Sequence, residues 1–204
     1  LWAGEKSYKL PNKNIIKIIK SYIESTNTKI FHFYNQKGYG IMKEISIESL
    51  SFNPWTKIGK DCFLLTSGDE NSFDTMTVGW ASTGVMWRKN VISAMVRPNR
   101  YTYEFMEKND LFTVSFYGEE YKKALSFCGS HSGRDCDKAK EAGLTPEFTD
   151  GTTTFKEAKL TFVCRKIYAQ DFDINLVAPD VKPANGSDPI HKLFMGEILK
   201  VYEN

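Results

Sequence analysis

The hydrophobic residues of this chain lie in short runs separated by polar turns, a pattern typical of β-strands. Strands are predicted at CFLLTSG (62–68), NVISAMVR (90–97) and LFTVSFY (111–117). Two longer strands are predicted at 159–169 and 192–201, on either side of the polar loop APDVKPANGSDP. This number of separate apolar runs favours a fold built mainly from β-strands.

Helical spacing is confined to short segments. Tyr121, Ala124, Leu125 and Cys128 follow the i, i+3, i+4, i+7 rule, and Gly129 ends that helix. Further short helices are predicted after Pro98, ending near Asn109, and in RDCDKAKEAGLTP, closed by Gly143. Because strands and helices do not alternate regularly, the pattern predicts a barrel or sandwich of mostly antiparallel strands with a few short α-helices.

The stretch FDTMTVGWASTGVMW (73–87) has two unlike faces if it is extended. One face carries Asp74, Met76, Val78, Trp80 and Ser82, and the other carries Phe73, Thr75, Thr77, Gly79 and Ala81. A flat ring can approach a backbone only where side chains are small, so Thr77, Gly79, Ala81 and Ser82 suit a ring-binding surface. The alternative is that Thr75 and Thr77 are β-formers on a solvent face, with Trp80 and Trp87 in the core or a dimer interface.

A second candidate site lies at the predicted turn into the helix after Pro98. Arg97, Arg100, Tyr101 and Thr102 would bring positive charge and hydrogen-bond donors to a helix start, an arrangement that suits a phosphate. Alternatively, Arg100 pairs with Glu104, four residues along the helix.

Composition bounds the class of protein. With 204 residues, 41% of them hydrophobic, the chain can bury one substantial core and is expected to form one main domain. Residues 1–41 carry a net charge of +5 and residues 42–204 carry −3, so the body has no basic surface for nucleic acid. Since there is neither a membrane-spanning run nor a secretory signal pattern, a cytoplasmic location is expected.

The first 41 residues differ in composition from the rest, being rich in Lys, Asn, Ile and Tyr. Met42 opens MKEISIESLSF, which reads as a start, and the codons of Lys37 and Gly38 would form a purine-rich run shortly before it. We therefore interpret 1–41 as a non-native or upstream-translated leader, and 42–204 as the protein proper. The competing interpretation is an amphipathic helix at NKNIIKIIKSYIEST.

The cysteines, Cys62, Cys128, Cys136 and Cys164, form no CxxC pair and are expected to be reduced. A metal on Cys128, His131 and Cys136 is disfavoured, because no fourth ligand is near, and no metal is expected. The sequence also lacks GxGxxG after a strand, GxxxxGK[ST], HExxH and GxSxG. A Rossmann site, a P-loop and a histidine-based hydrolase are thereby disfavoured.

Five motifs occur in an order that resembles the flavin reductase-like family of FMN-binding split barrels, in its flavoredoxin-type subgroup. They are TMTVGW (75–80), VRPNRYT (96–102), FTVSF (112–116), CGSHSGRDCDK (128–138) and HKLFMGEI (191–198). The resemblance implies a Greek-key split β-barrel, a homodimer whose interface helps to form the flavin sites, and NAD(P)H-dependent reduction of flavin by hydride transfer to N5.

The resemblance also implies a set of site residues. TMTVGWAS would run beside the isoalloxazine ring and RPNRYT would hold the phosphate, with His191 near the reacting rings as a candidate catalytic residue, or alternatively a surface histidine. Asp74, Asn90 and His131 depart from the family pattern, and a carboxylate at position 74 would disfavour an anionic reduced ring. The implied cofactor-binding residues are Asp74, Thr75, Met76, Thr77, Val78, Gly79, Trp80, Ala81, Ser82, Arg97, Arg100, Tyr101, Thr102, Ser115, Phe116, Cys128 and Lys138.

Three functions follow from these observations. The first is an FMN-containing NAD(P)H:flavin oxidoreductase that passes electrons to free flavin or to a redox partner. The second is a flavoredoxin-like electron carrier reduced by a protein partner. The third is a flavin-free binding barrel.

Overall fold

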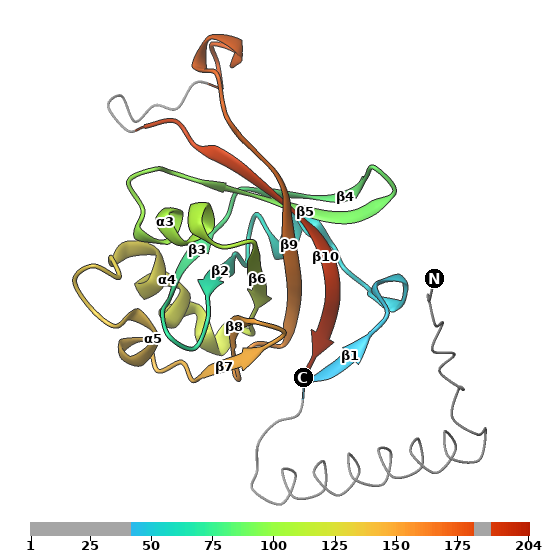
Figure 1. Ribbon diagram of the computed structural model, residues 1–204, viewed down its shortest axis with the longest axis vertical. Coiled ribbons are helices and arrows are strands. Elements are labelled where there is room, and N and C mark those ends of the chain that lie inside the picture. The colour runs from blue at the N-terminus through green and yellow to red at the C-terminus, as the bar shows by residue number, and fades with distance from the viewer. Residues whose placement is uncertain (1–41, 182–188) are drawn as a thin grey trace, which may run out of the picture. The chain divides into compact units, whose positions relative to one another are not determined.

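Eight of the strands in the described part of the chain form one antiparallel sheet (Figure 1). The structure, a computed structural model, describes residues 42–181 and 189–204; both interpretations of residues 1–41 therefore lie outside the described residues. The sheet has the strand order β3-β2-β6-β9-β10-β5-β4, with β1 added on β10. Its strands are β1 (Lys43–Ile45), β2 (Phe63–Gly68), β3 (Phe73–Val78), β4 (Ala81–Met86), β5 (Lys89–Val96), β6 (Leu111–Phe116), β9 (Leu160–Asp171) and β10 (Lys192–Glu203).

The remaining elements are short. The hairpin β7 (Pro146–Thr149) and β8 (Thr152–Phe155) forms a separate two-stranded sheet. The helices are α2 (Pro54–Lys57), α3 (Tyr101–Lys108), α4 (Lys122–Ser130) and α5 (Lys138–Glu141), with single 3-10 turns at Ile47–Ser49, Glu119–Tyr121 and Ile174–Leu176. The predicted mainly β barrel with a few short helices is confirmed. Within the described residues, no helix is long and apolar enough to cross a membrane.

The two ends of the sheet are consecutive in the sequence. Strands β3 and β4 end the strand order on opposite sides, and only Gly79 and Trp80 connect them. Because two residues span only about 7 Å, the sheet must curl until its end strands β3 and β4 lie close together, and it is split where these two strands do not pair. Figure 1 also shows that one end of the β9–β10 pair extends beyond the other strands, towards the turn at Ile174–Leu176.

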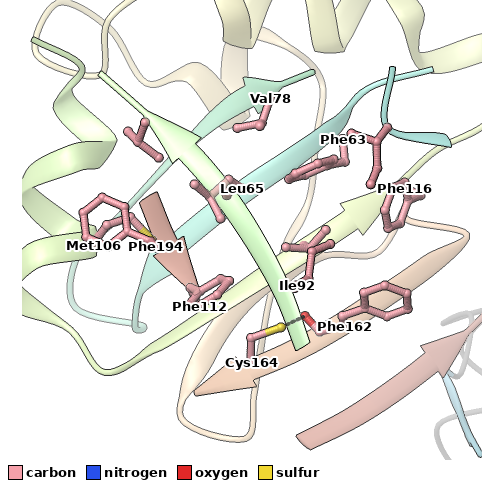
Figure 2. Packing of buried hydrophobic residues seen from close by; sticks show 14 of the residues in the cluster. Phe63, Leu65, Val78, Ile92, Met106, Phe112, Phe116, Phe162, Cys164 and Phe194 are labelled. Carbon is pink, nitrogen blue, oxygen red and sulfur yellow. Dashed lines mark hydrogen bonds between the residues drawn. The ribbon is translucent and has the colours of Figure 1, made fainter. Parts of the chain in front are cut away.

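Aromatic and aliphatic side chains fill the inside of the curved sheet (Figure 2). Phe63, Leu65, Ile92 and Phe194 have almost no accessible surface, and Phe116 packs edge-on against Phe162 with ring centroids 5.6 Å apart. The alternation of strand residues turns Leu64 to the opposite face, where it joins Leu125, Cys128 and Phe155 in a second buried cluster. Because β2 is buried on both faces, α4 and the β7–β8 hairpin must cover its outer side.

Two hairpins were missed by the sequence analysis. The stretch 73–87 was treated as one extended segment, but β3 ends at Val78, and 81–86 form the separate edge strand β4, which pairs with β5 through the two-residue turn Trp87–Arg88. Both turn residues have positive φ, 51° and 61°, which is unusual for large side chains. The β7–β8 hairpin turns at Asp150–Gly151, also with positive φ, and this dipeptide is a strong hairpin signal.

Candidate functional site

A cavity of about 640 Å³ opens where the sheet is split. Its walls come from four parts of the chain: helix α2 with Ile58 and Gly59, the segment 79–83, Met95 of β5, and residues of the segment that connects β9 to β10. Trp80 and Ala81 lie on the second of these walls, and His191 lies on the fourth. The volume is in the usual range for small-molecule sites, about 300–1,000 Å³.

The Gly79–Trp80 connection is fixed by its neighbours. A Cβ atom at Gly79 would lie 3.2 Å from the Cys62 Sγ atom, so a larger residue would press on that side chain. The Met95 N–H donates a hydrogen bond of 3.1 Å to the Trp80 carbonyl oxygen, which attaches the connection to β5. The Trp80 and His191 rings lie 4.9 Å apart, tilted by 41°. The cavity therefore has a tethered backbone and one aromatic pair.

The chemistry of the cavity is mostly apolar. Among the described residues that line it, none is Lys, Arg, Asp or Glu, and the polar side chains are Ser82, Thr83 and His191. The Thr83 hydroxyl donates to the Val91 carbonyl oxygen at 2.8 Å, so it is already used within the sheet. The cavity suits a flat apolar group with a few hydrogen-bonding atoms, and provides no countercharge for an anion.

Positive charge gathers at the start of α3. Arg97 is half-buried after the end of β5, and Arg100 is exposed at the N-cap, where its side chain does not itself cap the helix. Arg134, which the sequence analysis did not select, lies over the Tyr101 ring at 4.9 Å and donates to the Asn99 carbonyl oxygen at 3.4 Å. The sequence feature that could have identified it is the arginine in SGRD, between two predicted helices. These residues suit an anionic group.

The alternative pairing of Arg100 is not the one formed. Glu104 lies on α3, as that alternative requires, but its carboxylate forms an ion pair with Arg134. The Arg100 side chain is thus the exposed cation nearest in sequence to the first N–H groups of α3.

Asp74, Thr102 and Lys138 lie together, but they bind one another. The Thr102 hydroxyl and the Lys138 ammonium donate to the same Asp74 oxygen, Oδ2, at 2.5 Å and 3.0 Å. The Asp74 and Lys138 side chains are only 5% and 4% exposed. The Lys138 ammonium therefore balances the charge of the Asp74 carboxylate, and the expected phosphate contacts of Thr102 and Lys138 stay predictions.

The small face of β3 holds a helix. Thr77 donates to the Leu125 carbonyl oxygen of α4 at 2.5 Å, and a Cβ atom at Gly129 would lie 3.3 Å from the Thr77 Cβ. Thr75 is buried, with its hydroxyl 2.8 Å from that of Thr66. The solvent-face alternative is wrong for Thr75, which is buried, whereas the ring-binding role of Thr75 and Thr77 stays a prediction. The small Thr77 side chain allows α4 to approach the strand closely.

Five further predicted residues lie away from the cavity. Met76 and Val78 pack in or against the barrel core, and Phe116 lies within it. The buried Ser115 hydroxyl contacts those of Thr154 and Thr161, because the β7–β8 hairpin covers that side of β6. Cys128 is 1% exposed, and burial raises the pKa of its thiol to about 11, as expected for a packing residue.

The structure thus divides the predicted site residues into three groups. Gly79, Trp80, Ala81, Ser82 and His191 line one cavity. Arg97, Arg100 and Tyr101 lie at the start of α3. The others contact neighbouring parts of the protein away from this cavity; most are buried, and Met76 and Thr77 are half-buried. Trp55, Met95 and Phe172 also line the cavity but were not predicted. In the case of Trp55, the available signal was an aromatic residue directly after the Asn53–Pro54 turn.

The chain was compared with protein families and with solved structures. The family model described as "Flavin reductase like domain" matches residues 56–204. None of the curated proteins searched matches the chain.

Several solved structures share the fold. The flavoredoxin of Methanosarcina acetivorans has a TM-score of 0.58 at 23% identity, covering 79% of this chain and 76% of its own. The flavoredoxin of Desulfovibrio vulgaris (Miyazaki F) has a TM-score of 0.57 at 21% identity, with 79% and 77% covered. An FMN-binding protein from Thermus thermophilus, solved with bound 1-cyclohex-2-enone, has a TM-score of 0.57 at 19% identity, with 78% and 80% covered. The architecture is therefore that of a split barrel.

The buried ion pair generates a stability prediction. Lys138→Met should lower the free energy of unfolding by about 3–5 kcal/mol, because the Asp74 carboxylate would remain buried without its cation. Urea unfolding followed by circular dichroism measures the change. Lys140→Met, at an exposed position of the same helix, is the control and should change the free energy of unfolding by less than about 0.5 kcal/mol. Equal effects of the two substitutions would contradict the assigned role of the pair.

Proposed function

The chain belongs to the family of flavin reductase-like domains, and from this we propose that it is an FMN-binding oxidoreductase that reduces flavin with NAD(P)H. The observation that carries the proposal is the uncharged cavity at the split of the sheet, with the small residues Gly79, Ala81 and Ser82 along one wall. The proteins of the same fold include two flavoredoxins and an FMN-binding protein, which supports FMN as the cofactor.

The residues of the cavity fit an isoalloxazine ring. The short side chains of Gly79, Ala81 and Ser82 leave backbone groups accessible to a flat ring system, and the apolar walls exclude water from it. When bound, FMN would supply the hydride-accepting chemistry. Trp80 and His191 form the adjacent aromatic wall, and the His191 ring can hold or release a proton beside the reacting rings.

The phosphate of FMN is assigned to the start of α3. Arg97 and Arg100 supply positive charge there, and the first N–H groups of an eight-residue helix point in the same direction. Met95 lines the cavity and Arg97 follows it by two residues, so the same strand leads from the ring site to the phosphate site. Thr102 and Lys138 contribute indirectly, by fixing α3 and α5 to β3 through Asp74.

A second candidate is a flavoredoxin-like carrier that receives electrons from a protein. It is favoured by the two flavoredoxins among the solved structures of the same fold. Electron transfer to free flavin or to a redox partner is compatible with the first candidate, so the two differ in the source of electrons.

Anaerobic reduction separates the two candidates. In protein loaded with FMN, NADH or NADPH alone should bleach the visible flavin absorbance, because the pyridine nucleotide is the proposed hydride donor. Dithionite provides the positive control for reducible flavin. Bleaching by dithionite but by neither nucleotide would reject the reductase and leave the carrier, whereas failure to bind FMN would reject both.

Arg100→Ala tests the phosphate assignment. The variant should bind FMN about tenfold or more weakly, since a hydrogen bond to a charged group contributes about 1.5–3 kcal/mol. Quenching of flavin fluorescence during titration of FMN-free protein measures the dissociation constant. Riboflavin lacks the phosphate and is the control ligand, so its affinity should not change. An equal loss for both flavins, or no loss for either, would contradict the assignment.

We also propose that the protein is a homodimer that uses the hairpin patch, which consists of Val85, Met86, Trp87 and Tyr168. Val85 is 73% exposed and Trp87 is 63% exposed. The Trp87 and Tyr168 rings meet edge-on at 6.1 Å, which joins the β4–β5 turn to β9 in one surface. An exposed apolar surface of this kind is suited to contact with a second copy of the chain.

Val85→Asp should convert the dimer to a monomer, because it places a charge in the centre of the apolar patch. Sedimentation equilibrium at several protein concentrations gives the mass. Leu199→Asp, at an exposed position of β10 outside the patch, should leave the dimer intact. A wild-type protein that remains monomeric at all concentrations would refute the proposal.

A further inference from the structure

Trp55 stands at the cavity with most of its surface in solvent. It lies on α2, lines the cavity and is 83% exposed, more than Trp80 at 58%. Burying an aromatic side chain is one of the larger gains available to a protein, so an exposed indole at an apolar cavity is an unused binding surface.

The short helix that carries Trp55 is fixed in place. The Asn53 side-chain oxygen accepts hydrogen bonds from the N–H groups of Trp55 and Thr56 at 3.1 Å and 3.5 Å. Pro54 begins the helix, and Ile58, directly after it, is buried in the barrel core. Trp55 is therefore held on a short structure anchored at both ends, and little conformational entropy would be lost when a ligand contacts its ring.

Trp55 and the proposed ring site lie at different depths. Gly79 and Ala81 are half-buried, whereas Trp55 is the most solvent-exposed of the aromatic side chains lining the cavity. A flavin against the short side chains would leave Trp55 nearer the solvent, where a second molecule enters. That molecule would meet indole and aliphatic surface, with hydrogen-bond donors from Ser82 and His191.

The charge of the cavity limits what that molecule can be. A phosphate, sulfonate or carboxylate group placed inside the cavity would find no countercharge in the described lining, and desolvating its charge there would be costly. This restriction does not apply to NAD(P)H if only its uncharged nicotinamide ring enters and its phosphates stay outside. A flat uncharged ring that carries carbonyl oxygens matches both the aromatic surface and the donors.

We propose that Trp55 is a specificity-determining residue that holds an uncharged quinone-class compound as the electron acceptor. This inference rests on the proposed function. Conversion of a quinone to a hydroquinone takes up two electrons and two protons. NAD(P)H supplies both electrons and one proton as a hydride, and water supplies the second proton. The overall reaction is therefore balanced without a further reductant.

Binding measurements on the full-length, FMN-loaded protein test this proposal. The probes are 2-(hydroxymethyl)anthraquinone, which is flat and uncharged, and anthraquinone-2-sulfonate, its anionic counterpart; equilibrium dialysis gives both dissociation constants. Trp55→Ala should weaken binding of the uncharged probe about tenfold, and Trp55→Phe should weaken it less, because it retains a ring. The wild-type protein should bind the sulfonate more weakly than the uncharged probe.

Two further variants complete the experiment. Phe148→Ala removes an exposed aromatic residue outside the cavity lining and should leave both dissociation constants unchanged. Trp55→Arg adds a cation and should weaken binding of the uncharged probe while strengthening that of the sulfonate. This reversal also excludes general unfolding as the cause of a weakened site.

The outcomes separate this inference from the proposed function. Unchanged affinity in Trp55→Ala, or sulfonate binding as tight as that of the uncharged probe, overturns the role of Trp55. Loss of FMN from Trp55→Ala also overturns it, because the indole would then hold the flavin itself. If no preparation binds FMN, the proposed function fails, and dialysis of the FMN-free protein still decides whether Trp55 holds the quinone.

Discussion

The split of the sheet is the constraint on which the other features depend. Strands β3 and β4 are neighbours in sequence but lie at opposite ends of the strand order, so Gly79 and Trp80 must cross the gap between them. A crossing of two residues requires a close backbone approach, which the glycine allows beside Cys62, and the hydrogen bond from Met95 fixes its far side. Because the strands do not pair across the gap, a cavity remains there.

Small residues serve two different purposes along one stretch of sequence. In β3, Thr77 is small where α4 packs close to the strand, with Gly129 against it, and the buried Thr75 shares a hydroxyl contact with Thr66 of β2. After β3 ends at Val78, Gly79, Ala81 and Ser82 are small where the cavity opens. The two-residue alternation of a strand would place the small residues before and after Val78 on the same two faces. Because β3 ends at Val78, that alternation does not continue into the segment that lines the cavity.

The sequence predicted the position of an element well where its buried residues form an apolar run or follow helical spacing. Strands with apolar runs, such as β2 and β6, and the helix ending at Gly129 were predicted close to their observed positions. Strand β4 was not distinguished from β3, because a segment rich in Ser, Thr and Gly gives no boundary signal of its own. The contacts of Asp74 with Thr102 and Lys138 join residues up to 64 positions apart, and no local pattern indicates such a pairing.

The distribution of charge connects the fold to the proposed chemistry. Cations gather at the start of α3, the carboxylate of Asp74 is neutralised inside the protein, and the described cavity lining is uncharged. Strand β4 borders that cavity and is itself without charged residues, although an exposed edge usually needs charges to prevent pairing with other chains. An uncharged edge beside an uncharged cavity is consistent with a surface that another molecule covers. The strain of Trp87 and Arg88 in the hairpin turn is then understandable, because the turn places the Trp87 ring against Tyr168 on that surface.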